Sequence, residues 1–323
     1  MRRIKPEGSY HALIGHMDEA GGVEEFDEGL TQYSSPDEFV LGPDGDLWFA
    51  DDASAIGGSA IGRISPEGAI TRFTTGLGAS RPRRIVVGPG GNFWFTGVGD
   101  SPAIGFATPE GAISAFSLPG RPRDLVGGPD GNIWFTYGGE SVSPASGEIK
   151  EFRDGLNQEG SIWDIAVGPG GYIWFTNPGA NDVDRVSEQG EITEIGNGGL
   201  VEPRDITAGP DGNMWFTYWR GIGKVSLQGE VTSLREKIAP DSSPREIVSG
   251  PDGRLWFVSY GESAIPAIGR IIPGMPKLQP VLGKHSSDRL PEGMASTAPY
   301  RLNLILDRSL GLSRRQDSGQ SRG

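Results

Sequence analysis

Residues 128–136 read Gly-Pro-Asp-Gly-Asn-Ile-Trp-Phe-Thr, and versions of this stretch recur along the chain. The pattern Gly-Pro-Asp/Gly-Gly-x-x-Trp-Phe begins six times, at spacings of 46, 40, 40, 41 and 41 residues. Four short strands in a unit of about 40 residues are typical of a β-propeller blade. The repeat therefore predicts an all-β propeller. Its copies begin at Gly42, Gly88, Gly128, Gly168, Gly209 and Gly250.

Each copy has similar surroundings, which define four strands, A to D, from the central channel outward. A short apolar stretch, opened by Pro in five of the six copies, precedes the phrase and is strand A. Pro suits the second position of a tight turn and Gly a position of positive φ, so the phrase itself is the A–B hairpin. Trp-Phe-Thr is then strand B, and we expect its indole to pack between adjacent blades. Six Trp residues occupy this slot: Trp48, Trp94, Trp134, Trp174, Trp215 and Trp256.

The number of blades follows from counting strand pairs. Seven C–D pairs accompany six A–B pairs, so we expect seven four-stranded blades, one of them incomplete. The propeller is expected at residues 1–283, with its repeats at 14–272, and an irregular tail at 284–323. Residues 299–306 of the tail are a candidate strand A that closes the ring, and composition predicts that the tail ends in disorder. The C–D pairs span residues 14–26, 61–73, 104–116, 142–152, 183–195, 222–234 and 268–278.

The composition agrees with this fold and limits the kinds of molecule that are expected to bind the protein. With 52 Gly and 25 Pro in 323 residues, the chain is poorly suited to long helices. A net charge of −13 repels the phosphate backbone and argues against nucleic acid as a partner. No apolar leader and no run of 18 apolar residues is visible, so neither export nor a membrane is indicated. We expect a monomer in the cytoplasm, although zero Cys leaves the compartment undecided.

One slot repeats at the entrance of strand A, where loops of all blades converge at the channel mouth. The residue after the strand-A Pro, or after Ile162, is basic or aromatic in five of six copies. Arginines grouped in this way would suit a small anionic or peptidic ligand bearing carboxylate, phosphate or sulfate. The slot holds Asp37, Arg83, Arg123, Trp163, Arg204 and Arg245.

A structural interpretation of the same slot stays open. The next residue is Glu38, Arg84, Asp124, Asp164, Asp205 or Glu246, so each Arg could pair with a carboxylate of a neighbouring blade. Trp163 and Trp219, the two indoles outside the strand-B slot, are further candidates for a ligand-binding surface.

The slot that follows Trp-Phe-Thr is a second candidate ring. It holds Asp51, Gly97, Tyr137, Asn177, Tyr218 and Ser259. The chain's histidines, which are the usual general bases near neutral pH, are His11, His16 and His285, and all lie outside both rings. The Asp of the Pro-Asp-Gly phrase occurs in four of the six copies and once in each of those blades, which indicates turn chemistry and not a cation site. These residues are Asp44, Asp130, Asp211 and Asp252.

The repeated phrase, followed by Ile-Gly-Arg-Ile and Gly-x-Ile-Thr-x-Phe, resembles the virginiamycin B lyase (streptogramin B lyase) family over roughly residues 14–272. The resemblance implies a seven-bladed propeller. It also implies a carbon–oxygen lyase of the antibiotic-resistance type, which opens cyclic streptogramin B antibiotics at an ester by a Mg²⁺-dependent elimination.

The family's catalytic slots can be placed here by order from the C-terminal end. The two His slots hold Arg204 and Arg245, and the two Glu slots hold Ser243 and Tyr260. One blade earlier, Glu202 precedes Pro203, but that match also lacks a His. An elimination needs a base, and Arg, which is always protonated, cannot be one. Two hypotheses follow: a streptogramin-lyase-like enzyme with Mg²⁺ as the implied cofactor, or a non-catalytic propeller with an arginine-rich mouth that binds a ligand or partner.

Overall fold

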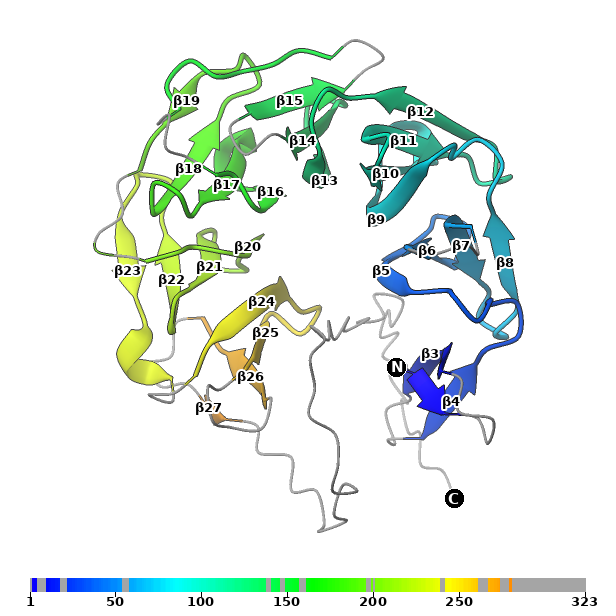
Figure 1. Ribbon diagram of the computed structural model, residues 1–323. Helices are drawn as coiled ribbons and strands as arrows, with labels where there is room; N and C mark the ends of the chain where they lie inside the picture. Colours follow the sequence, from blue (N-terminus) through cyan, green and yellow to red (C-terminus); the bar gives the residue numbers. More distant parts are fainter. Residues whose placement is uncertain are drawn as a thin grey trace, which may run out of the picture.

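The structure, a computed structural model, describes residues 2–4, 10–17, 22–53, 58–137, 141–145, 149–156, 161–195, 199, 201–238, 242–260, 267–273 and 279–280. Antiparallel sheets stand side by side around a central axis, which is the arrangement of a β-propeller (Figure 1). The predicted all-β fold is therefore confirmed. None of the described helices is long and apolar enough to cross a membrane.

Five of the described sheets have four strands, each strand hydrogen-bonded to its neighbour in the chain. The first two are β5 (Pro36–Leu41), β6 (Leu47–Asp51), β7 (Ala60–Ile64) and β8 (Ile70–Phe73), then β9 (Ser80–Val87), β10 (Phe93–Gly99), β11 (Ala103–Ala107) and β12 (Ile113–Ser117). The third and fourth are β16 (Ile165–Val167), β17 (Ile173–Asn177), β18 (Asp182–Val186) and β19 (Ile192–Thr193), then β20 (Ile206–Ala208), β21 (Met214–Tyr218), β22 (Gly221–Val225) and β23 (Val231–Ser233). The fifth is β24 (Pro244–Ser249), β25 (Leu255–Ser259), β26 (Ala267–Ile271) and β27 (Gln279–Pro280).

The remaining described sheets are smaller. A three-stranded sheet contains β13 (Pro122–Gly127), β14 (Ile133–Tyr137) and β15 (Ser141–Ala145), and two pairs contain β1 (Arg2–Ile4) with β2 (Tyr10–Ala12) and β3 (Ile14–Met17) with β4 (Val23–Phe26). Short 3-10 turns are η1 (Pro89–Gly91), η2 (Pro169–Gly171) and η3 (Arg235–Lys237). The pair β3–β4 is the first predicted C–D pair. The last predicted D strand lies slightly later than expected, because β26 pairs with Gln279 and Pro280. The tail at 284–323, with the candidate closing strand 299–306, lies outside the described residues.

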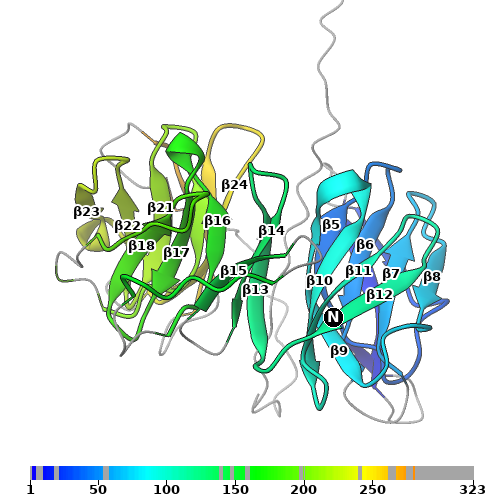
Figure 2. The same ribbon diagram turned by 90° about the horizontal axis from the view of Figure 1, so that it is seen from above.

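The first strand of each larger sheet is the innermost, as expected for strand A. Strands β5, β9, β13, β16, β20 and β24 surround the centre in Figure 1, and Figure 2 shows the ring from its side. The entrances of these strands consequently lie around one rim of the channel.

The A–B phrase forms the predicted hairpin turn. Gly45, Gly131, Gly212 and Gly253 adopt φ values of 86°, 78°, 75° and 72°, which glycine tolerates without a Cβ clash. The preceding Asp accepts a hydrogen bond from the strand-B indole, for example from Trp215 Nε1 to Asp211 Oδ1 at 2.9 Å. The recurring Asp is thus explained by turn chemistry and by this bond to Trp.

The strand-B indoles pack where one blade meets the next, as predicted. Trp48 is fully buried and stacks on Phe93 of the following sheet, with ring centroids 4.0 Å apart. Trp174 likewise belongs to a core cluster with Met214 and Phe216 of the next sheet. Most of the hydrophobic core therefore lies between blades.

Replacing Asp211 with Ala is expected to lower the free energy of unfolding by about 1–3 kcal/mol, because the buried Trp215 Nε1 would lose its acceptor. The thermal midpoint, followed by near-UV circular dichroism, measures this. Asp252→Ala is the matched control, since its bond to Trp256 is longer, at 3.4 Å, and more exposed. Equal losses in both variants would contradict the explanation.

Candidate functional site

Threonines at the end of strand B join the rim residues of successive blades. Trp163 N donates to the carbonyl of Thr176 at 3.0 Å, and Thr176 Oγ1 donates to the carbonyl of Arg204 at 2.7 Å. In the same way, Arg204 N donates to the carbonyl of Thr217, whose Oγ1 donates to the carbonyl of Arg245, both at 2.8 Å. Trp163, Arg204 and Arg245 therefore follow one another around the rim, as the repeat predicts.

The slot one residue further on forms a row of carboxylates inside the channel. Each of these carboxylates follows a rim residue by one position along the chain. They are Asp124 and Asp164, which are 8% exposed, and Asp205. Each accepts a backbone hydrogen bond from the next blade, and these bonds join three successive inner strands to their neighbours. The donors are Ile165 N to Asp124 at 3.1 Å, Ile206 N to Asp164 at 2.8 Å and Ile247 N to Asp205 at 2.5 Å.

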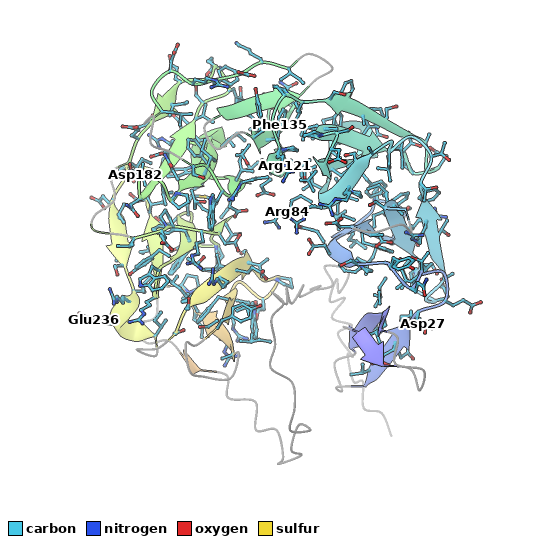
Figure 3. The ribbon with its side chains drawn as sticks, in the orientation of Figure 1. Asp27, Arg84, Arg121, Phe135, Asp182 and Glu236 are labelled. Carbon is cyan, nitrogen blue, oxygen red and sulfur yellow. The ribbon has the colours of Figure 1, made fainter. Side chains whose placement is uncertain are left out.

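Arg84 is the cation of this row and lies at the centre of the ring (Figure 3). Its guanidinium contacts Glu38 at 2.6 Å, Asp124 at 3.4 Å and Asp164 at 3.6 Å, which come from three different blades. Burial lowers the pKa of Arg84, but the charges of Asp124, Glu38 and Asp164 outweigh burial and raise it well above its ordinary value.

The carboxylates of the row have raised pKa values. Burial raises the pKa of Asp124 well above its ordinary value, and the charge of Arg84 offsets this only in part. Burial and the neighbouring charge of Asp205 raise the pKa of Asp164 well above its ordinary value, and burial also raises the pKa of Asp205. This row explains how the blades are joined. Each carboxyl group of the row holds one backbone N–H of the next blade, and its other partners are Arg84 and the neighbouring carboxyl groups of the row.

Two rim positions form charged or aromatic pairs at the surface. Arg83 is 55% exposed and lies 3.6 Å from Asp52, which also contacts Arg81 at 3.4 Å. Arg123 is exposed and its guanidinium carbon lies 4.6 Å from the ring centroid of Trp163. The geometry therefore brings Arg123 and Trp163 together.

Arg204 stands apart from these because its side chain is only 9% exposed. Its Nη2 donates to Glu202 Oε2 at 2.9 Å, and its guanidinium lies 5.8 Å from the ring centroid of Trp219. The guanidinium of Arg220 lies 5.6 Å from the same ring. Trp219 N donates to the carbonyl of Val201 at 2.8 Å, which holds the backbone of Trp219 beside the loop that leads to Arg204. Sequence reasoning named Arg204 and Trp219, but it did not include Arg220.

The residues in the family's catalytic slots lie on adjacent blades. Ser243 is buried, its N donates to Ser259 Oγ at 3.1 Å, and its carbonyl accepts from Tyr260 N at 3.0 Å. Arg245 is exposed. Guanidinium groups cannot ligate a cation, so Arg204, Ser243, Arg245 and Tyr260 do not fit a Mg²⁺ site. Within the described part of the chain no group of three or more His, Asp or Glu is placed to hold a metal ion.

The residues of the second candidate ring lie beside the entrance of strand A, where Asp51 pairs with Pro36 and Tyr137 pairs with Pro122. All six of its residues are buried inside their blades. Asp51 Oδ1 accepts from Ser35 N at 2.6 Å, and Asn177 Oδ1 accepts from Ser161 N at 2.9 Å. These side chains fix the loop that leads into strand A. Of the histidines, His16 is exposed on β3.

Solved structures provide a geometric comparison. The chain is 27% identical to a catalytically inactive virginiamycin B lyase variant from Staphylococcus aureus, solved with quinupristin, with a TM-score of 0.65 over 80% of this chain and 90% of that one. It is 26% identical to the selenomethionine-substituted virginiamycin B lyase from Staphylococcus aureus, with a TM-score of 0.64 over 79% and 89%. A streptogramin B lyase structure gives 26% identity and a TM-score of 0.64 over 77% and 84%. A search of curated proteins finds no match.

The sequence profile of the virginiamycin B lyase family matches two overlapping stretches, residues 8–197 and 120–275. These cover most of the chain and nearly all of the described sheets. The chain therefore belongs to the virginiamycin B lyase family.

Proposed function

We propose that this chain is a seven-bladed propeller of its family that binds a small anionic or peptidic ligand at its arginine-rich mouth and does not catalyse elimination. The observation that carries the proposal is the identity of the residues in the catalytic slots. Arg204 and Arg245 occupy the two places where the family has a base, and neither can accept a proton. A guanidinium in such a place binds an anion instead.

The charge around the rim supports the same function. Arg83, Arg123, Arg204 and Arg245 recur at one level of the ring in a chain whose net charge is −13. Such a local concentration of positive charge at the mouth of a channel attracts anions from solution. The exposed Trp219 and the partly exposed Trp163 add apolar area on which a peptide or ring could lie.

A second candidate function is the family's ring-opening elimination, with Mg²⁺ as the implied cofactor. It is favoured by family membership and by Glu202, which carries a carboxylate beside Arg204. That carboxylate is bonded to the guanidinium and has no histidine partner in its slot. Elimination therefore lacks the pair of proton-transfer groups that the family's slots provide.

Incubating the full chain with quinupristin and Mg²⁺ separates the two functions. We expect mass spectrometry and chromatography to recover the intact cyclic compound. A ring-opened product of unchanged mass would establish elimination and overturn the proposal, whereas hydrolysis would add the mass of one water. The virginiamycin B lyase of Staphylococcus aureus serves as the positive control.

Sulfate binding tests the positive part of the proposal. We expect saturable binding by the unchanged protein, and a loss of at least tenfold in affinity in the double variant Arg204→Ala/Arg245→Ala, because charge-assisted bonds are removed. The double variant Arg153→Ala/Arg235→Ala removes an equal charge from exposed positions outside the rim slot, and should leave binding unchanged. Equal affinity in all three proteins would show that the rim does not bind anions.

A further inference from the structure

Arg204 has hydrogen-bonding capacity that the protein does not use. Its Nε and Nη1 are buried and have no hydrogen-bond partner among the described residues. Only Nη2 is matched, by Glu202. Leaving a buried charged donor without an acceptor is unfavourable, so an acceptor supplied from outside the chain would be favoured at this position.

The indole of Trp219 lies over this guanidinium, and the other described blades have no Trp at the equivalent position. The position of Trp219 is occupied by Asp52, Val98, Pro178 or Tyr260 in other copies of the repeat. Trp219 is nevertheless 37% exposed, and the neighbouring Val201 is 49% exposed. A partly exposed indole therefore lies beside an apolar side chain and next to an arginine, two of whose nitrogens have no acceptor.

The backbone around Arg204 is unusual as well. Among the described residues, three that are not glycine adopt positive φ: Asn181 at 63°, Glu202 at 51° and Arg220 at 56°. All three belong to this corner, because Glu202 N donates to Asn181 Oδ1 at 2.9 Å and Arg220 lies against Trp219. Residues other than glycine adopt this conformation infrequently, and such positions gather at functional sites.

We infer that this corner, formed by Asn181, Val201, Glu202, Arg204, Trp219 and Arg220, binds an aromatic carboxylate. The inference rests on the proposed function and names the ligand class for part of the same mouth. The ligand's negative charge meets the guanidinium of Arg204, whose Nε and Nη1 have no acceptor among the described residues. The ligand's carboxylate accepts hydrogen bonds from Arg204, and its ring stacks on Trp219.

Entry requires a local movement of the indole. Since Nε and Nη1 of Arg204 are covered, Trp219 turns aside to admit the carboxylate and then packs against the ligand's ring. Trp219 and Arg220 form the two-residue connection between β21 and β22, so the movement is confined to one hairpin end. Binding therefore changes the environment of a single indole.

Calorimetric titration of the full chain with 2-naphthoate tests the inference, with naphthalene-2-carboxamide and acetate as probes that lack the charge or the ring. We expect 2-naphthoate to bind at least tenfold more tightly than either. Arg204→Gln should weaken its binding at least tenfold, whereas Arg235→Gln, an exposed arginine on η3, should not change it. Trp219→Phe should retain most of the affinity, and Trp219→Leu should lose it severalfold.

The inference is overturned if 2-naphthoate shows no saturable binding, or binds no better than acetate. It is also overturned if a folded Arg204→Gln keeps full affinity. Should Arg204→Gln fail to fold, the two Trp219 variants decide, because equal affinity in Phe and Leu would exclude stacking on this ring. A further outcome separates this inference from the proposed function. If sulfate binding depends on Arg204 and Arg245 but an aromatic carboxylate is not preferred, this inference is overturned and the proposed function is retained.

Discussion

The variant Arg84→Met is expected to lower the free energy of unfolding by about 3 kcal/mol at pH 8. Arg84 is the cation in contact with Glu38, Asp124 and Asp164, and methionine would fill its volume without its charge. The three carboxylates would then face one another in a poorly hydrated channel. Since a carboxylate without its cation is disfavoured by burial, the loss arises mainly from the unpaired charges left behind.

The pH dependence of this loss identifies its cause. The pKa values of Asp124 and Asp164 are already raised by burial, and removing Arg84 would raise them further. At pH 5 these groups can take up protons, so the destabilisation should be smaller there than at pH 8. Chemical denaturation at both pH values measures the difference.

The adjacent arginine provides the control. Arg83→Met removes an exposed ion pair with Asp52 and should change stability by less than about 1 kcal/mol. If the two variants were equally stable, Arg84 would not join the blades electrostatically.

A gain in stability of about 4 kcal/mol above pH 7 is expected for Asp184→Asn. Asp184 is fully buried on β18, and burial raises its pKa from 3.8 to about 7, with smaller contributions from Asp182 and Glu194. Its Oδ1 accepts a hydrogen bond from Ile195 N at 3.2 Å, which an amide oxygen can also accept.

The unchanged protein becomes less stable as the pH rises, because the folded chain binds the Asp184 proton more tightly than the unfolded chain does. The folded chain holds the Asp184 proton up to about pH 7, whereas the unfolded chain releases it near the ordinary pKa of 3.8. Stability is therefore lost as the pH rises from about 4 to 7, and remains lower above that range. The asparagine variant has no proton to release, so this part of the pH dependence should disappear.

Unfolding curves at pH 4.5, 6 and 8 test this expectation. The two proteins should differ least at the lowest pH and most at the highest. Asp182→Asn, a change of the same type at a partly exposed neighbour, should give a much smaller gain. A constant difference between Asp184→Asn and the unchanged protein would exclude the buried proton as its origin.

The spacing of the Trp-Phe phrase was sufficient to predict the propeller, its inner strands and the position of the indoles between blades. A repeat carries this information because the same turn and core contacts must form in every copy. The rim could be located for the same reason. Trp163, Arg204 and Arg245 occupy equivalent positions, and the Thr176 and Thr217 bonds place them in order.

Differences between copies could not be predicted, because they depend on neighbours from other loops. Arg83 and Arg204 occupy the same slot, yet one is 55% and the other 9% exposed. Arg204 is the more buried of the two because Glu202 and Trp219 lie against it, and only folding brings these three residues together. Asp184 occupies the strand position that glycine occupies in other blades. At one of these glycines, Gly62, an added Cβ would meet the ring of Phe49. No sequence pattern reveals that its carboxyl is buried.

The backbone bonds to Asp124, Asp164 and Asp205 all run the same way, since each blade supplies the acceptor and the next supplies the donor. The coupling that these three bonds carry is therefore between nearest neighbours, as in linear repeat arrays, whereas the Arg84–Asp164 contact skips one blade. A defect in one bridging residue should loosen the two blades that it joins and leave distant blades unaffected. Amide exchange would show this as faster opening in one contiguous arc, so the propeller can tolerate local opening at its mouth while the rest of the ring stays closed.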